Sequence, residues 1–177
     1  VLEVDSILDS FPEERVTGIY EVVALETASL LTRMGEYQKA YDLVNRFTLG
    51  PGQTGNARTY LNLADELRLA ESFEMARNLY KDVQLASSVE EFPEAFLWEA
   101  YIHMQEGRPS IAASVLEDFG EVEKTVWYFP LVQLVRGALA QEEGRNEDAI
   151  LALSKGSVYT TTNDPWTPEL LFRTSEA

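Results

Sequence analysis

Apolar side chains recur along this chain at the three- and four-residue spacing of an amphipathic helix. One such set, Ala40, Val44 and Phe47, returns at intervals of about 36 residues. Because a helix with one apolar stripe buries that stripe against a neighbour, each set predicts a helix that faces a partner. The equivalent sets are Val4, Leu8 and Phe11 upstream, then Ala76, Tyr80 and Val83, and finally Ala112, Leu116 and Phe119.

A second apolar column lies on the segments that precede these helices. It consists of leucines at steps of 36, 36 and 37 residues, namely Leu25, Leu61, Leu97 and Leu134. Three residues after each leucine stands a small residue, in the series Ala28, Ala64, Ala100 and Gly137. A small residue on a helix face lets a neighbouring helix approach closely, so we expect the two kinds of helix to pack in pairs.

A short polar segment separates the two helices of each predicted pair. Three of these segments begin with a glycine, at Gly35, Gly107 and Gly144, and the remaining one has Glu71 at that place. Glycine ends a helix at little steric cost, so each segment indicates a tight turn between two antiparallel helices. A fixed period of this size is typical of stacked supersecondary units.

The predicted fold class is therefore all-α, a solenoid of stacked helix hairpins, taken as one domain over residues 1–177. Ser157–Asp164 is expected to be a polar loop, followed by Thr167 as the N-cap of the last helix. Both ends of the sequence stop within the pattern, so we interpret the chain as part of a longer array. The predicted segments are a half repeat at 1–12, repeats at about 13–49, 57–88, 93–122 and 130–156, and a partial repeat at 165–177.

Charge and composition narrow the classes of partner. The chain has 30 acidic and 14 basic residues and a net charge of −16, which disfavours nucleic acid and anionic membrane surfaces. The same field favours basic or neutral partners. No apolar run approaches 18 residues, so no membrane insertion is expected. Without cysteine, disulfides, thiolate metal sites and cysteine nucleophiles are excluded, while the cellular compartment stays open.

The repeated hairpin resembles the tetratricopeptide repeat, a two-helix unit of about 34 residues. The resemblance rests on the small residues above and on the aromatic residues Tyr37 and Phe73, which open second helices. Departures are the longer step, Glu71 in place of a glycine, and Asn146 where an aromatic residue is usual. The resemblance implies a right-handed superhelix whose first helices line a concave groove, and hence a non-enzymatic scaffold that binds proteins or peptides.

The groove that this resemblance implies supplies the candidate binding residues. The leucines among them have two interpretations: core packing between first helices, which we favour, or the apolar floor of a groove for an amphipathic or extended peptide. The charged and aromatic members would then give specificity. The candidates are Arg33, Arg58, Leu61, Asp65, Arg68, Leu97, Tyr101 and Met104.

Other motifs give no support for catalysis or a cofactor. Glu99 and His103 lie one helical turn apart, but two groups do not make a zinc site, so a packed histidine is favoured. Gly50 and Gly55 have the spacing of a phosphate loop, yet no Lys-Ser/Thr follows. We predict no enzyme activity, cofactor or metal. The apolar cluster at 127–130 is either a cap on a hairpin junction or an exposed hot spot, and self-assembly into a homo-oligomer is the alternative function.

Overall fold

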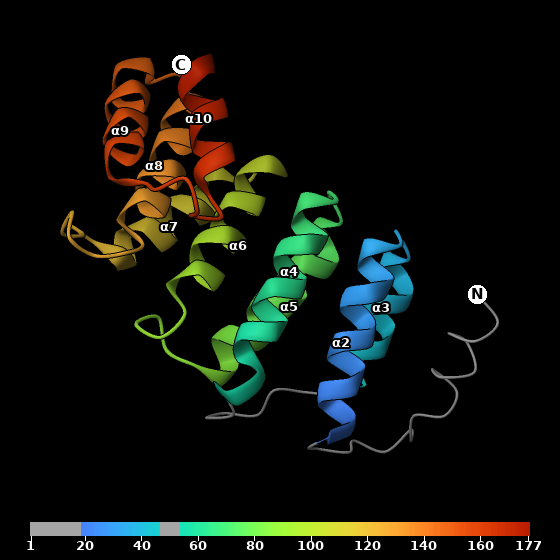
Figure 1. Ribbon diagram of the computed structural model, residues 1–177. Helices are drawn as coiled ribbons and strands as arrows, with labels where there is room; N and C mark the ends of the chain where they lie inside the picture. The colour runs from blue at the N-terminus through green and yellow to red at the C-terminus, as the bar shows by residue number, and fades with distance from the viewer. Residues whose placement is uncertain (1–18, 47–53) are drawn as a thin grey trace. The chain divides into compact units, whose positions relative to one another are not determined.

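The computed structural model describes residues 19–46 and 54–177, and every regular element within these ranges is helical (Figure 1). The all-α prediction is confirmed. The predicted half repeat at 1–12 lies outside the described residues. None of the helices in the described ranges is long and apolar enough to cross a membrane.

The chain divides into two compact units, Val1–Phe92 and Pro93–Ala177. The boundary falls between the second and third predicted hairpins, a division that the prediction of one domain does not include. Each unit is therefore described by itself.

The first unit contains two helix hairpins. Helix α2 (Ile19–Arg33) packs on α3 (Tyr37–Val44), and α4 (Ala57–Leu69) packs on α5 (Phe73–Ala86). The first helices α2 and α4 also contact each other, as expected of stacked hairpins. A short 3₁₀ helix, Thr54–Asn56, leads into α4.

The second unit contains two further hairpins and a last single helix. Helix α6 (Pro93–Gln105) packs on α7 (Pro109–Phe119), and α8 (Phe129–Glu142) packs on α9 (Asn146–Tyr159). Helix α8 is central, because it also contacts α6, α7 and the last helix, α10 (Thr167–Glu176). The helix α10 lies against α9 as well (Figure 1).

The four turns between paired helices share one hydrogen-bond pattern. After α4, the backbone N–H of Glu71 donates to the carbonyl of Arg68 at 3.0 Å, and that of Ser72 donates to Leu67 at 2.9 Å. The turns after α2, α6 and α8 repeat this pair of bonds, which defines a Schellman motif. The motif needs a positive φ at one residue. That residue is Gly35 (φ 80°), Glu71 (φ 59°), Gly107 (φ 73°) or Gly144 (φ 72°).

The core consists of the predicted columns. The small residues of the first helices that the sequence identifies as packing positions are buried, and the alanines of the second helices, Ala40, Ala76, Ala112 and Ala149, have no exposed surface. Gly137 on α8 lies so close to α9 that an added Cβ would be 2.5 Å from Cγ of Leu153. The spacing of small residues in the sequence therefore identifies the contact line within each hairpin.

Two predicted boundaries near the C-terminus are wrong. Helix α9 continues to Tyr159, so residues 157–159 are helical instead of belonging to a polar loop. Trp166, not Thr167, occupies the N-cap of α10. The hydroxyl of Thr167 instead donates to the carbonyl of Thr161 at 2.5 Å, which ties the start of α10 to the preceding loop.

Candidate partner-binding site

The apolar candidates of the predicted groove belong to the core. Leu61 is 1% exposed and Leu97 is 0% exposed, and Met104 is buried as well. Side chains buried to this extent offer no surface to a partner, so the structure corrects the groove-floor hypothesis for these three residues. Core packing is the interpretation that agrees with their burial.

Two of the charged candidates of the first unit, Asp65 and Arg68, pair with each other. Arg68 is buried, with its Nε 3.9 Å from Oδ1 of Asp65, and Asp65 also accepts a 2.5 Å hydrogen bond from the hydroxyl of Tyr80. Burial, together with the Asp65 carboxylate, raises the pKa of Tyr80, so this hydroxyl remains a donor. Asp65 and Arg68 therefore act within the hairpin formed by α4 and α5.

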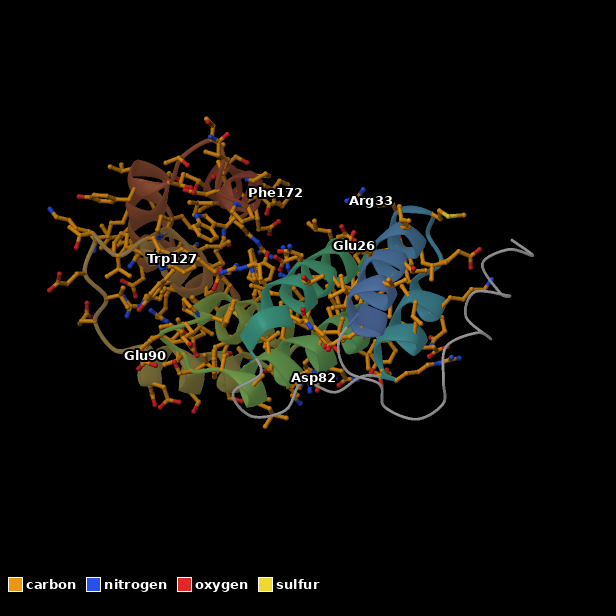
Figure 2. The ribbon with its side chains drawn as sticks, turned by 60° about the horizontal axis from the view of Figure 1, so that its bottom comes forward. Glu26, Arg33, Asp82, Glu90, Trp127 and Phe172 are labelled. Atoms are coloured by element: carbon orange, nitrogen blue, oxygen red, sulfur yellow. The ribbon has the colours of Figure 1, made fainter. Side chains whose placement is uncertain are left out.

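Arg33 and Arg58 are exposed but lie far apart. Arg33 extends away from the end of α2 (Figure 2), with Nε 4.0 Å from Oε1 of Glu66. The guanidinium of Arg58 lies over the ring of Phe92, 5.0 Å from its centroid. Glu66 and Arg58 are eight residues apart on α4, or about 12 Å along a helix axis. The two arginines therefore do not form one binding site.

Tyr101 joins two helices of the second unit instead of facing a partner. Its hydroxyl donates to the carboxylate of Glu169 on α10 and accepts hydrogen bonds from Nε and Nη2 of Arg173, at 3.1 and 2.9 Å. Arg173 also pairs with Glu169 at 3.2 Å. Burial, followed by the hydrogen bond to Glu169, raises the pKa of Tyr101. These three side chains link α6 to α10, and the hydroxyl of Tyr101 is already hydrogen-bonded within the chain.

The single histidine is buried on α6. Its Nε2 lies 3.5 Å from Oε1 of Glu99, which agrees with the packed and paired interpretation. Within residues 19–46 and 54–177, no group of three or more acidic or histidine side chains is placed to hold a metal ion.

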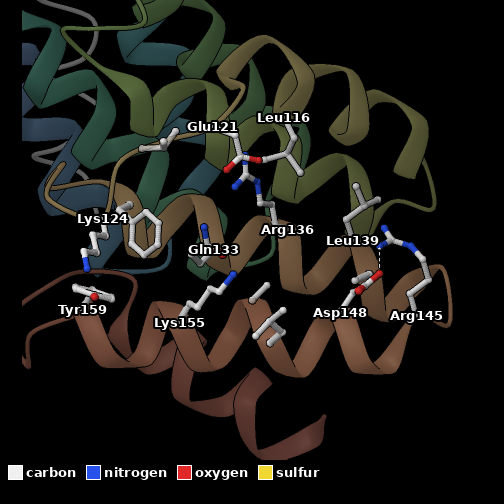
Figure 3. A pocket seen from close by; sticks show the side chains of 15 residues that line it. Leu116, Glu121, Lys124, Gln133, Arg136, Leu139, Arg145, Asp148, Lys155 and Tyr159 are labelled. Atoms are coloured by element: carbon white, nitrogen blue, oxygen red, sulfur yellow. Dashed lines mark hydrogen bonds and ion pairs between the residues drawn. The ribbon is translucent and has the colours of Figure 1, made fainter.

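A hollow of about 560 Å³ lies in the second unit, over the outer face of α8. Its walls come from α7, from the link at 120–128 and from α9 (Figure 3), and we call it the α8 hollow. Apolar side chains form much of its surface, at Leu116, Phe129, Leu139, Leu151 and Tyr159.

The charge of the α8 hollow is opposite to that of the whole chain. Four of the 14 basic residues line it, together with the acidic residues Glu121 and Asp148. The basic residues are Lys124 on the link, Arg136 on α8, Arg145 before α9 and Lys155 on α9. Because the net charge is −16, this concentration of cations marks the hollow as a distinct electrostatic environment.

The four cations differ in how far they are already neutralised. Arg145 bonds to Glu143 at 2.8 Å and to Asp148 at 2.6 Å, and these hydrogen bonds raise its pKa. Arg136 donates to the backbone carbonyl of Gly120, which carries no net charge. Lys155 is exposed and forms no hydrogen bond or ion pair with the rest of the described chain.

One end of the α8 hollow is aromatic. The rings of Phe129 and Tyr159 meet edge to face at 5.4 Å, and the ammonium of Lys124 lies 5.9 Å from the centroid of Tyr159. Trp127 on the adjoining link is 52% exposed and lies 6.0 Å from Trp166. The exposure of Trp127 agrees with the hot-spot interpretation of the cluster at 127–130. Phe129 and Pro130 are buried and Tyr128 packs edge to face on Phe119 of α7, which agrees with a cap on the hairpin junction.

Sequence reasoning missed the α8 hollow. Two of its cations follow an acid in the repeat immediately before, Lys155 after Asp118 and Arg136 after Glu99. The earlier repeats do not keep this contrast, since Arg46 stands in the first column and Leu63 in the second, so the columns gave no clear signal.

Comparisons with known proteins add no identification. A scan against protein-family models gives no match, and neither curated proteins nor solved structures show a significant similarity to the chain. The tetratricopeptide repeat thus stays a resemblance carried by the residues of the chain itself.

Proposed function

We propose that this chain is a non-enzymatic binding module that holds a segment of a partner protein, with the α8 hollow as its contact site. The observation that carries the proposal is the composition of that hollow. It combines exposed apolar surface at Leu151 and Tyr159 with cations in an otherwise acidic chain. Sites that bind protein segments combine apolar anchors with polar groups that fix orientation.

The arrangement of helices supports this proposal. Stacked hairpins of the kind that resemble tetratricopeptide repeats give a rigid support for a surface site, because each helix packs on neighbours along its whole length. The floor of the hollow lies on α8, which contacts four other helices. A rigid site loses little conformational entropy when a partner segment binds.

The test is capture of a partner by matched variants. The immobilised full chain is exposed to extract from its native cells at low salt, beside the variants Leu151→Asp and Leu85→Asp. Leu151 is 56% exposed and lines the hollow, whereas Leu85 is 72% exposed on α5 in the other unit. We expect a protein that is retained by the wild type and Leu85→Asp and lost from Leu151→Asp, and then bound directly when purified. Equal retention on all three supports, or no retained protein, would contradict the proposal.

Self-assembly is a second candidate function, and one observation favours it. Phe172 stands four residues after Pro168 on α10, as Leu134 stands four residues after Pro130 on α8, but it is 55% exposed, as is its neighbour Leu171 (Figure 2). In the preceding first helices the leucine column that contains Leu134 is buried. The exposed pair therefore resembles a stacking face that could take a helix of a second copy. Light scattering over a concentration series tests it, and a monomer at every concentration would contradict it.

A further inference from the structure

We propose that the α8 hollow binds a carboxylate group attached to an apolar substituent. The inference rests on the proposed function in one respect, since the same hollow is used, and it adds the chemical class of the ligand. Two groups in the hollow, Gln133 and Lys155, make no hydrogen bond or ion pair within the described residues.

Gln133 is the first of these groups. It lies on α8 in the lining of the hollow and is only 5% exposed, yet its amide makes no hydrogen bond within the described part of the chain. The amide atoms keep access to the hollow and make no bond within the described chain, so they are available to a ligand or water there. Its NH₂ can donate and its carbonyl can accept.

Lys155 is the second group. It extends from α9 toward α8, on the side where Gln133 and Arg136 lie (Figure 3). Its ammonium has no anionic partner within the described residues, while Arg145, at the other end of the hollow, is held by Glu143 and Asp148. An anion between α8 and α9 would therefore meet a free ammonium and an amide donor together.

The hollow suits a carboxylate better than a phosphate. Two oxygens in one plane match the donors of Lys155 and Gln133, with further N–H groups on the guanidinium of Arg136. A single negative charge is enough to engage Lys155, whereas each further charge on a ligand would also face Glu121, which lines the same hollow. The buried or half-exposed faces of Phe129, Leu151 and Tyr159 then provide contact for an apolar substituent.

The experiment is a titration of the full chain, followed by the backbone amide resonances of an isotope-labelled sample. Three probes are used: hexanoate, the blocked peptide acetyl-Leu-Glu-Leu-amide, and its uncharged counterpart acetyl-Leu-Gln-Leu-amide. We expect saturable shifts on α8, α9 and the link at 120–128 with a carboxylate probe, and none with the glutamine peptide. Stronger binding of hexanoate would identify a free organic acid as the source, and stronger binding of the glutamate peptide would identify an acidic side chain.

Charge reversal at one lysine provides the matched comparison. Lys155→Glu should weaken binding by about tenfold or more, because a hydrogen bond to a charged group is lost and repulsion is added. Lys81→Glu makes the same change of charge at an exposed position on α5 and should alter binding by less than about twofold. Gln133→Leu keeps the volume of the side chain but removes the amide, and should weaken binding while the melting temperature stays near that of the wild type.

Three results would overturn the inference: no saturable shift with either carboxylate probe, an equal response to the glutamine peptide, or unchanged affinity in Lys155→Glu. Its failure is separate from failure of the proposed function. A partner that is lost from Leu151→Asp but kept by Lys155→Glu would support the binding module and reject the carboxylate. Binding of hexanoate, with no protein retained in the capture experiment, would support the carboxylate site and reject the binding module.

Discussion

Glu71 occupies a backbone position that the other three hairpin turns give to glycine. Its φ of 59° lies in the left-handed region, and its side chain is exposed and makes no hydrogen bond or ion pair with the other described residues. An L-residue in this region is strained by the approach of its Cβ to the following carbonyl oxygen. Replacing Glu71 by glycine should therefore stabilise the first unit.

The magnitude is the difference between two effects. Relief of the left-handed strain contributes about 1 to 2 kcal/mol. Glycine gives the unfolded chain more freedom, which costs about 0.4 to 1 kcal/mol. We expect a net stabilisation of about 0.5 to 1 kcal/mol, which for a chain of this length raises the melting temperature by about 1 to 4 °C.

Two further variants separate the backbone effect from the change of charge. Glu71→Gln removes the negative charge but keeps the Cβ, so the backbone effect is the difference between Glu71→Gly and Glu71→Gln. Gly107→Ala is the reciprocal change at φ 73°, where an added Cβ would meet no atom within 4 Å, so only the conformational cost appears. Thermal and urea unfolding measure all three. If Glu71→Gly is no more stable than Glu71→Gln, the argument from left-handed strain is refuted.

Three other experiments, using five substitutions, test the packing. Leu61→Ala should lower the free energy of unfolding by about 2 to 5 kcal/mol in urea, whereas the same change at Leu171, a half-exposed leucine on α10, should stay within about 1 kcal/mol. Equal effects would contradict the burial of Leu61. Tyr101→Phe removes a hydroxyl that links α6 and α10. It should lower the free energy of unfolding by about 1 to 3 kcal/mol and speed hydrogen exchange of the backbone amides in α10. Unchanged exchange would count against this connection between the two helices. Gly137→Ala should lower the free energy of unfolding by about 1 to 3 kcal/mol, measured by thermal melting. The double variant with Leu153→Ala should lose less than the sum of the two single losses. Strict additivity would show that the contact between Gly137 and Leu153 is not tight.

The sequence was sufficient for the hairpins because their signals are local or strictly periodic. A small residue such as Ala64 or Ala100 indicates close helix packing wherever it stands in the repeat, and the structure buries both. The turn motif was recognisable even with Glu71 in place of glycine, since the segment around it has the same length as the other three turns. The end of α9 was missed because Ser157 and Val158 are polar or weakly helical by propensity, and tertiary contacts extend the helix beyond them.

The contacts that give individual side chains their roles could not be predicted in the same way. Tyr101 meets Glu169 and Arg173 across 68 and 72 residues of sequence, and no column relates these positions. Periodicity predicts which faces are buried, but not which polar groups meet where the repeats diverge. The α8 hollow arises at such a divergence, because the link at 120–128 is longer than the turns within the hairpins.

The two electrostatic features of the chain act at different distances, and this bears on the ligand. At about 0.1 M ionic strength the Debye length is about 10 Å, so the net charge of −16 repels an anionic ligand over the surface as a whole. Lys155 and Arg136 attract only within the hollow. A highly acidic segment would be repelled before it reached them, whereas one carboxylate among apolar or basic residues would not. The expectation of a basic or neutral partner from composition and the carboxylate site in the hollow are therefore compatible. They are both satisfied by a segment that carries a single acid beside an apolar anchor.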